Sequence, residues 1–412
     1  MLKFLLGALI FFLPTQLGYH FWLAPAYVWG IRVDFLSPTF FLTDVIVFLI
    51  AVFYEAKKHW LEQWVSFFKK KPASFLIILF LALNIFLSSR RIVAGYRFLK
   101  LAEFIFLIYF FQHEFKEKWR LPLFWANFYT CLIAWGQFFK EASLGKWFWW
   151  LGERSFNLAT NGIARAQIGS RLFLRPYATF SHPNSLAGFL LASILLLWPL
   201  RNNLSVGKRR FFDLAMVFFS LTLFLTFSWA AYLAILFLFI FIIFKERKIK
   251  AGFLVLLLLI AVVLQSIKVG LIERRSIDER LFLADNALQL VKAHPIFGVG
   301  LGNFIPAQLE LSFLRGHDNF LQPVHNIYLL VASETGLTGL IIFMVMVVYL
   351  IKKLIKNLSS SFILYTLYVI LFLGLFDHYW LTLQQNMLLA ALVVGTVLKQ
   401  LKVRNQKILL HC

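Results

Sequence analysis

The chain has 412 residues, of which 61% are hydrophobic, 18% are aromatic and only 15% are charged. Apolar runs of bilayer-spanning length recur along it, which excludes a soluble globular protein and predicts an integral membrane protein of the α-helical type. The formal net charge is +22. The basic residues come in short bursts between apolar runs, as in cytoplasmic loops, so we assign the charge to topology and membrane lipids and expect no nucleic acid.

The apolar runs predict one membrane domain over residues 1–412, an all-α polytopic bundle of about twelve transmembrane helices. The first run lacks a small-residue cleavage pattern, so we expect a retained helix there. The run over 211–244 is too long for one span at about 1.5 Å per residue, and we divide it at Ser228. The expected spans are residues 2–19, 40–54, 74–87, 98–111, 123–139, 184–200, 211–227, 229–244, 251–267, 326–351, 361–376 and 381–398.

Lysine is concentrated in the short connections on one side of this layout. If the N-terminus is cytoplasmic, these connections are cytoplasmic too, as the positive-inside rule requires. Two long connections, 140–183 and 268–325, then lie on the extracytoplasmic side. The pair Arg90 and Arg91 also falls there, as the exception to the rule.

Four of the acidic residues that stand in or beside the apolar runs have expected structural roles. Asp34 and Asp44 follow turn-forming sequence, so we expect turn and helix-cap roles for them, with a functional role as the alternative. Glu103 lies inside an expected span and would be costly in lipid, so it is expected to pair with a neighbour such as Lys100. Asp213 is expected to lie beside the arginines that precede it.

The first long connection ends in RAQIGSRLFLRPYATFSHPNSLAGFLL. Arg165, Arg171 and Arg175 are closely spaced there, and guanidinium groups at a membrane surface suit a phosphate or diphosphate. The alternative is a loop held by lipid headgroups and backbone carbonyls. Asn184 or the serine after it can cap the following helix.

The second long connection contains Arg280 and then AHPIFGVGLGNF. Gly298, Gly300 and Gly302 stand at every second position, which allows the backbone to turn and to approach a ligand or another segment closely. A phosphate-binding loop is one reading, but the strand and helix of a nucleotide fold are missing. A tight connection packed against the bundle is the other.

Histidines mark the entrances to two late helices. His325 and Asn326 begin a helix, where His325 could act as a base or as a cap. Asp377 and His378 lie between two expected spans and could support the same site or cap helix ends. We recognise no pair of histidines with a carboxylate at metal-binding spacing, so no metal and no other cofactor is expected.

Three motifs, HPNSLAGFLL, RLFLADNALQLVKAHPIFGVGLGNF and VHNIYLLVASETGLTGLIIF, appear in this order and resemble the O-antigen ligase and O-antigen polymerase superfamily. The likeness covers roughly residues 160–340. It implies an inverting, metal-independent glycosyltransferase of the GT-C type. It also implies that His325 orients or deprotonates the acceptor hydroxyl and that Arg280 binds the donor diphosphate.

One position departs from the family pattern. Many relatives carry Ser-Arg between the seventh and eighth helices, and this chain has Trp229 in place of that arginine. Either Arg171 or Arg175 supplies the missing charge, or the donor is held differently, or the transferase step has been lost.

These observations predict a multi-pass protein of the bacterial inner membrane with its active face outside the cytoplasm. The resemblance implies an undecaprenyl-diphosphate-linked glycan donor and a lipid or glycan acceptor as partners, beside membrane lipids. The site would comprise His325 as the catalytic residue, Arg280, Arg175 and Arg171 at the diphosphate, and Asn326, Gly298, Gly300 and His378 in support. A transporter and an inactive lipid-glycan binding protein are the rival interpretations, and ligase and polymerase activity are not separated.

Overall fold

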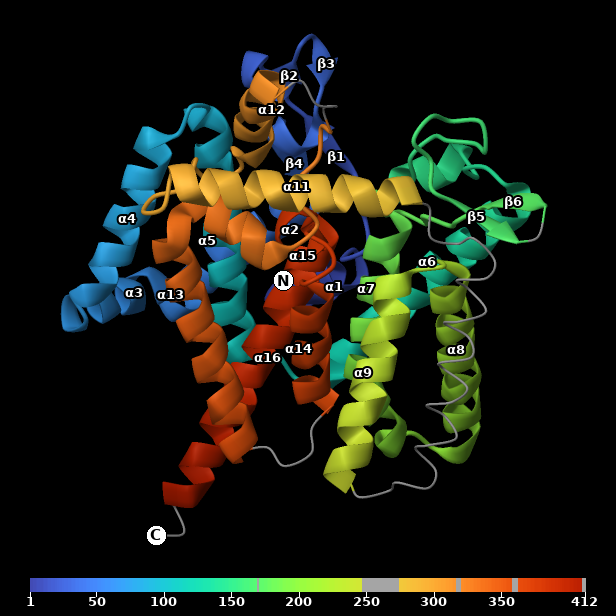
Figure 1. Cartoon of the computed structure of the whole chain (residues 1–412). Coiled ribbons are helices and arrows are strands. Elements are labelled where there is room, and N and C mark those ends of the chain that lie inside the picture. Colours follow the sequence, from blue (N-terminus) through green and yellow to red (C-terminus); the bar gives the residue numbers. More distant parts are fainter. Residues whose placement is uncertain (169, 247–273, 316–319, 358–361, 410–412) are drawn as a thin grey trace.

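The computed structural model describes residues 1–168, 170–246, 274–315, 320–357 and 362–409. It is mostly helical, as expected. Nearly upright helices form a bundle, and one long helix, α11 (Arg274–Ala293), lies across one end of it (Figure 1). We call this the α11 end of the bundle.

The first expected span is wrong beyond Phe11. Helix α1 covers only Leu2–Phe11, and Pro14, which has no backbone N–H, follows it. The chain then forms small antiparallel pairs at the α11 end, in which His20 pairs with Thr39. The elements of this N-terminal segment are β1 (Gly18–His20), η1 (Ala24–Ala26), β2 (Tyr27–Val28), β3 (Ile31–Arg32), η2 (Asp34–Leu36) and β4 (Thr39–Phe41).

Helices account for the next expected spans. Asp44 accepts a hydrogen bond from the backbone of Phe41 at 2.9 Å, which confirms its cap role at the start of α2. Arg90 donates to the carbonyls of Pro25 and Tyr27 and so holds the N-terminal segment, which explains its place outside the lysine-rich loops. The helices are α2 (Leu42–Lys58), α3 (Trp60–Lys70), α4 (Ala73–Leu87), α5 (Arg91–Glu114), η3 (Glu117–Trp119) and α6 (Arg120–Lys140).

The predicted division at Ser228 is confirmed, because α8 ends at Leu225 and α9 begins at Trp229. Asp213, however, pairs with Arg201 at 2.7 Å and not with the arginines directly before it. The elements of this part are η4 (Lys146–Leu151), β5 (Arg165–Ile168), β6 (Arg171–Leu174), α7 (Pro183–Leu197), η5 (Trp198–Asn203), α8 (Val206–Leu225) and α9 (Trp229–Glu246).

Where the structure describes it, the expected connection 268–325 contains two helices, α11 and α12, joined by a turn. The apolar face of α11 packs on α12 and α13. The expected span 251–267 lies outside the described residues. The remaining helices are α12 (Phe304–Arg315), α13 (Ile327–Asn357), α14 (Phe362–Leu373), α15 (Tyr379–Thr382) and α16 (Gln384–Leu409).

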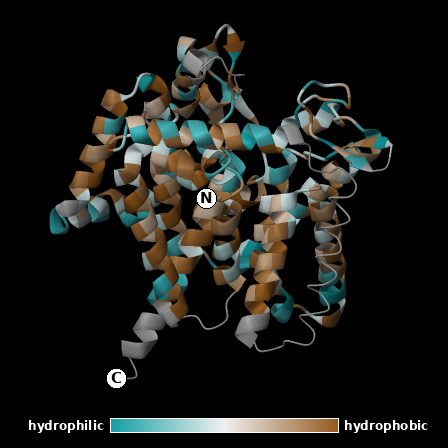
Figure 2. Cartoon of the chain, in the orientation of Figure 1, coloured by the Kyte–Doolittle hydropathy of each residue, from teal (hydrophilic) through white to brown (hydrophobic). Residues whose placement is uncertain are grey.

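Hydropathy along the described helices supports a membrane protein but not the number of spans. Among them, two segments, Pro183–Asn203 and Ile327–Ile355, are long and apolar enough to cross a membrane. The pair Trp60–Lys70 and Ser74–Leu87, bent by 102°, would be a third. The count of about twelve is therefore not confirmed, because several helices are short or, like α5, carry charged side chains. Many large hydrophobic side chains of the bundle are exposed, and α11 alternates hydrophilic and hydrophobic residues (Figure 2).

Candidate functional site

Two connections at the α11 end bring a histidine and a carboxylate together. His325 lies just before α13, and Asp377 lies between α14 and α15. The Nδ1 atom of His325 is 3.3 Å from Oδ1 of Asp377, and their side chains are 17% and 6% exposed. Because an ionised carboxylate only accepts hydrogen bonds, Nδ1 donates and Nε2 keeps a free lone pair. His325 is thus oriented as a proton acceptor.

Asn326 fixes the position of this pair. Its side-chain oxygen accepts hydrogen bonds from the backbone of Tyr328 and Leu329, at 2.9 and 3.0 Å, and so caps α13. Its side-chain amide donates to the carbonyl of Leu375 at 3.1 Å. The start of α13 is therefore tied to the segment that carries Asp377.

A chain of side chains joins Asp377 to a guanidinium group. Asn184, at the start of α7, donates to Oδ2 of Asp377 at 3.2 Å. Arg175 donates to the side-chain oxygen of Asn184 at 2.7 Å and to the carbonyl of Thr226 at 2.7 Å. Asn184 or the serine after it was expected to cap this helix, but the cap of α7 is His182, and the HPNS sequence was the available signal.

Arg280 reaches the same place from α11. It donates to the carbonyl of Phe376 at 3.3 Å, one residue before Asp377. Burial alone would raise the pKa of Asp377, but His325, through its charge and its hydrogen bond, and then His378 and Arg280 hold that pKa well below its usual range. Asp377 is therefore an anion, held between the imidazole of His325 and the positive charge of Arg280.

Two further histidines at the site are neutral. Burial lowers the pKa of His182 and of His378 to about 3. His378 lies beside His325, with ring centroids 5.2 Å apart, and its Nδ1 is 2.6 Å from the hydroxyl of Thr382. His182 accepts from the backbone of Asn184 at its Nδ1, so its proton is on Nε2. His325 is the remaining imidazole of the cluster.

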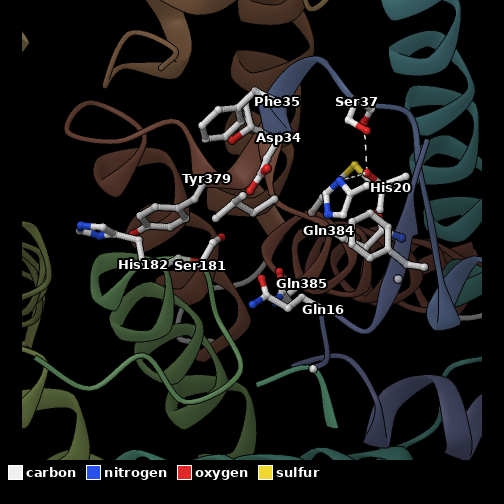
Figure 3. A pocket seen from close by; sticks show the side chains of 18 of the residues that line it. Gln16, His20, Asp34, Phe35, Ser37, Ser181, His182, Tyr379, Gln384 and Gln385 are labelled. Atoms are coloured by element: carbon white, nitrogen blue, oxygen red, sulfur yellow. Dashed lines mark hydrogen bonds between the residues drawn. The ribbon is translucent and has the colours of Figure 1, made fainter. Parts of the chain in front are cut away.

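A cavity of about 560 Å³ adjoins this cluster. His182, His325, Asp377 and His378 line it. Other parts of its wall come from the N-terminal segment and from the first residues of α16 (Figure 3). Sequence analysis did not connect the N-terminal segment with the site, because its residues carry no motif.

His325, Asp377 and His378 also form a set that could hold a metal ion, with one ligand atom from each within 4.8 Å of the others. Sequence analysis recognised no such set, and that reading of the spacing is wrong, because the fold joins residues from two connections. The charges oppose a cation here, since Arg280 and Arg175 stand beside the same cluster. Metal independence stays a prediction.

The two glycines expected in support are not among the residues that line the cavity. Gly298 and Gly300 have φ of +66° and +100°, a region that favours glycine. A Cβ at Gly298 would lie 2.4 Å from the backbone of Glu334, and one at Gly300 would lie 2.2 Å from Cβ of Ser88. The glycine-rich segment is therefore a turn packed tightly against α13 and the end of α4.

The three arginines expected at the diphosphate do not gather at one place. Arg171 is exposed on β6 and pairs with Glu141 at 3.1 Å, apart from the cluster. Trp229 begins α9, and its indole N–H is buried without a hydrogen-bond partner in the described part of the chain. Arg175 and Arg280 are the arginines beside the histidine cluster.

Comparison with known proteins finds a family match for part of the chain. Residues 214–344, less than half of the chain, match the family model for O-Antigen ligase. No curated protein matches the chain. The matched region contains Arg280, the glycine-rich segment and His325, whereas Arg175, Asn184 and Asp377 lie outside it. This match includes all of the second and third motifs and supports the resemblance to the O-antigen ligase superfamily.

Proposed function

We propose that this protein is a membrane glycosyltransferase that transfers or polymerises an undecaprenyl-diphosphate-linked oligosaccharide at the extracytoplasmic face. The observation that carries the proposal is the His325–Asp377 pair, 3.3 Å apart in a cavity wall, with Arg280 and Arg175 beside it. A lipid diphosphate donor is already activated. The protein must then supply a base for the acceptor and positive charge for the leaving group.

The proposed reaction is a single displacement with inversion. Nε2 of His325 takes the proton of an acceptor hydroxyl while that oxygen attacks the anomeric carbon of the donor. The bond from this carbon to the diphosphate breaks, and its electron pair stays on the diphosphate oxygen. Asp377 stabilises the imidazolium that forms, and Arg280 and Arg175 stabilise the diphosphate. No metal is needed in this scheme.

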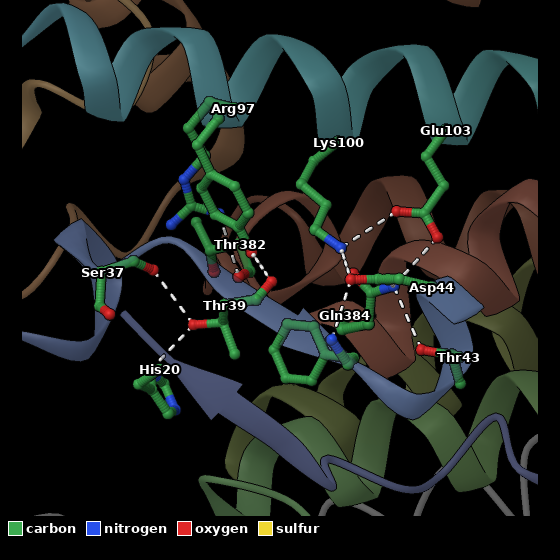
Figure 4. A network of polar contacts seen from close by, with 12 residues as sticks. His20, Ser37, Thr39, Thr43, Asp44, Arg97, Lys100, Glu103, Thr382 and Gln384 are labelled. Carbon is green, nitrogen blue, oxygen red and sulfur yellow. Dashed lines mark hydrogen bonds and ion pairs between the residues drawn. The ribbon is translucent and has the colours of Figure 1, made fainter. Parts of the chain in front are cut away.

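One buried network favours the rival interpretation, a transporter. Lys100 lies 2.6 Å from Asp44 and 3.2 Å from Glu103, which confirms the expected pairing of Glu103 (Figure 4). Gln384 of α16 donates to both carboxylates. Ionisable groups inside a helical bundle are typical of transporters. Here each charged group has an opposite partner, as in a structural ion-pair network, so we place this function second.

The test is a transfer assay with purified protein in nanodiscs, an undecaprenyl-diphosphate oligosaccharide and EDTA. Lipid A core or a second lipid-linked glycan serves as the acceptor. We expect product that persists in EDTA and is lost in His325→Ala, and the productive acceptor would separate ligase from polymerase. Folded protein that makes no product with either acceptor would refute the proposal and favour transport or glycan binding. A requirement for a metal would refute the metal-independent scheme.

A further inference from the structure

The cavity extends from His325 to a second group of polar side chains. This part is lined by residues of the N-terminal segment, by the residues just before α7 and by the start of α16 (Figure 3). The proposed diphosphate contacts make no use of it. Its polar lining includes Gln16, His20, Asp34, Ser181, Gln384 and Gln385.

Two polar atoms of this lining are buried and lack a partner. They are Nε2 of Gln16 and the hydroxyl oxygen of Ser181, and neither makes a hydrogen bond within the described residues. A buried donor left without a partner destabilises a protein by about 1–3 kcal/mol. Polar atoms kept in this state beside a cavity are therefore expected to bind a polar ligand.

Hydrogen bonds close to Gln16 and Ser181 in the sequence hold the segments that carry these unpartnered groups together. Thr179, two residues before Ser181, donates to the carbonyl of Pro14, two residues before Gln16, at 2.5 Å. Gln385 donates to the carbonyl of Thr179 at 3.1 Å. Three segments distant in sequence are thus joined at one point, and a site assembled in advance loses less entropy on binding.

The chemistry of this lining suits sugar hydroxyls better than phosphate. Amide and hydroxyl side chains both donate and accept hydrogen bonds, as a sugar hydroxyl does. Asp34 lies here with its carboxylate 3.8 Å from Arg154, and Glu153 also lines the cavity, with its carboxylate bound by Gln137 and by backbone N–H groups. Carboxylates repel a diphosphate but accept hydrogen bonds from hydroxyl groups. The diphosphate therefore belongs beside Arg175 and Arg280.

The N-terminal segment also contacts the histidine cluster directly. The ring of Phe35, next to Asp34, packs edge-on against His378 with centroids 5.3 Å apart. Arg97 donates to the carbonyls of Phe35 and Thr382 and so holds this contact. A ligand seated on the segment lies in the same cavity as His325.

We propose that Gln16, Ser181 and Asp34 form the subsite that binds the acceptor sugar and presents its hydroxyl to His325. This inference rests on the proposed function. The N-terminal segment, which lies outside the region matched by the family model, would then select the acceptor, while the matched region binds the donor.

The test measures KM for donor and acceptor separately in Gln16→Glu, Ser181→Ala and the double variant, with whichever acceptor the wild type uses. Gln16→Glu keeps the size of the side chain and removes its N–H donors. We expect about a fivefold higher acceptor KM in each single variant, equivalent to about 1 kcal/mol, and a larger rise in the double variant. Donor KM should stay within about twofold. Gln63→Ala, an exposed glutamine of α3, is the control and should change neither value.

The possible outcomes distinguish a failure of this inference from a failure of the proposed function on which it rests. An active wild type with an acceptor KM unchanged in the double variant would overturn the subsite and leave the function standing. A rise in donor KM alone would assign these residues to the donor glycan, which also overturns it. If Gln16→Glu does not fold, Ser181→Ala decides alone. An inactive wild type would refute the proposed function itself.

Discussion

Replacing Asp377 with asparagine tests the central pair of the site. The carboxylate accepts hydrogen bonds from Nδ1 of His325, the backbone N–H of His378 and the amide of Asn184. Asparagine has a similar shape but only one acceptor oxygen, and its amide group is a donor. At least one of the three donors would then face another donor, and the negative charge beside His325 would be gone.

The expected loss follows from the lost charge-assisted hydrogen bond. Such a bond contributes about 1.5–3 kcal/mol, and this one strengthens when the imidazolium forms in the transition state. The kcat of Asp377→Asn should therefore fall by about ten- to a hundredfold, with a smaller change in the apparent KM of the donor.

The assay is the initial rate of product formation in nanodiscs, with Asp213→Asn as the control. Asp213 also pairs with an arginine, Arg201, but it lies outside the cavity and should tolerate the change. In a protein that already carries His325→Ala, the second change at Asp377 should have no further effect, because both act on one proton transfer. A kcat above half of the wild-type value in Asp377→Asn would refute the orienting role.

Three other changes test neighbouring parts of the site. Arg280→Ala should raise the apparent donor KM at least about tenfold, as expected for a lost contact to a charged group. Arg171→Ala, on the exposed β6, should change the donor KM less than twofold. Equal effects of the two changes would contradict the assignment of Arg280 to the diphosphate. Trp229→Arg should not raise kcat, because Arg175 already places a guanidinium at this junction; a gain in kcat would show that the charge is missing. Burial lowers the pKa of His378 to about 3 from 6.5. As the pH falls, the unfolded state therefore binds a proton before the folded state does. The free energy of unfolding of the wild type should then decrease by about 1.4 kcal/mol per pH unit between these two pKa values. Thermal melts at pH 7 and pH 5 should show a smaller loss in His378→Gln, and an unchanged loss would refute a buried neutral imidazole.

Sequence periodicity predicted where the apolar helices lie better than it predicted the polar helix and the contacts between separate segments. Long apolar runs need internally paired backbones in a membrane, and this constraint acts locally, so the division at Ser228 was found from run length alone. The helical course of α11 was missed because its polar composition resembles a loop. The course of the chain after α1 includes the pairing of β1 with β4, a contact between separate segments that no run of hydropathy records.

Motifs located individual site residues but not their contacts. His325 and Arg280 stand in recognisable local sequence. The partner of His325 is Asp377, on a different connection, and its identity depends on how α13, α14 and α15 meet. Gln16 had no signal at all, because an amide after an apolar helix looks the same whether it faces solvent or a cavity.

The position of Arg175 bears on the departure at Trp229. Among the alternatives left open by the sequence, Arg171 is set aside by its exposed place on β6. Arg175 donates to the carbonyl of Thr226, in the junction between α8 and α9 where the family resemblance implies an arginine. Burial lowers the pKa of this guanidinium only to about 10, so it is charged at neutral pH. A second arginine at Trp229 would bring two like charges to one junction. The tryptophan is therefore consistent with an active transferase whose positive charge comes from the loop before α7.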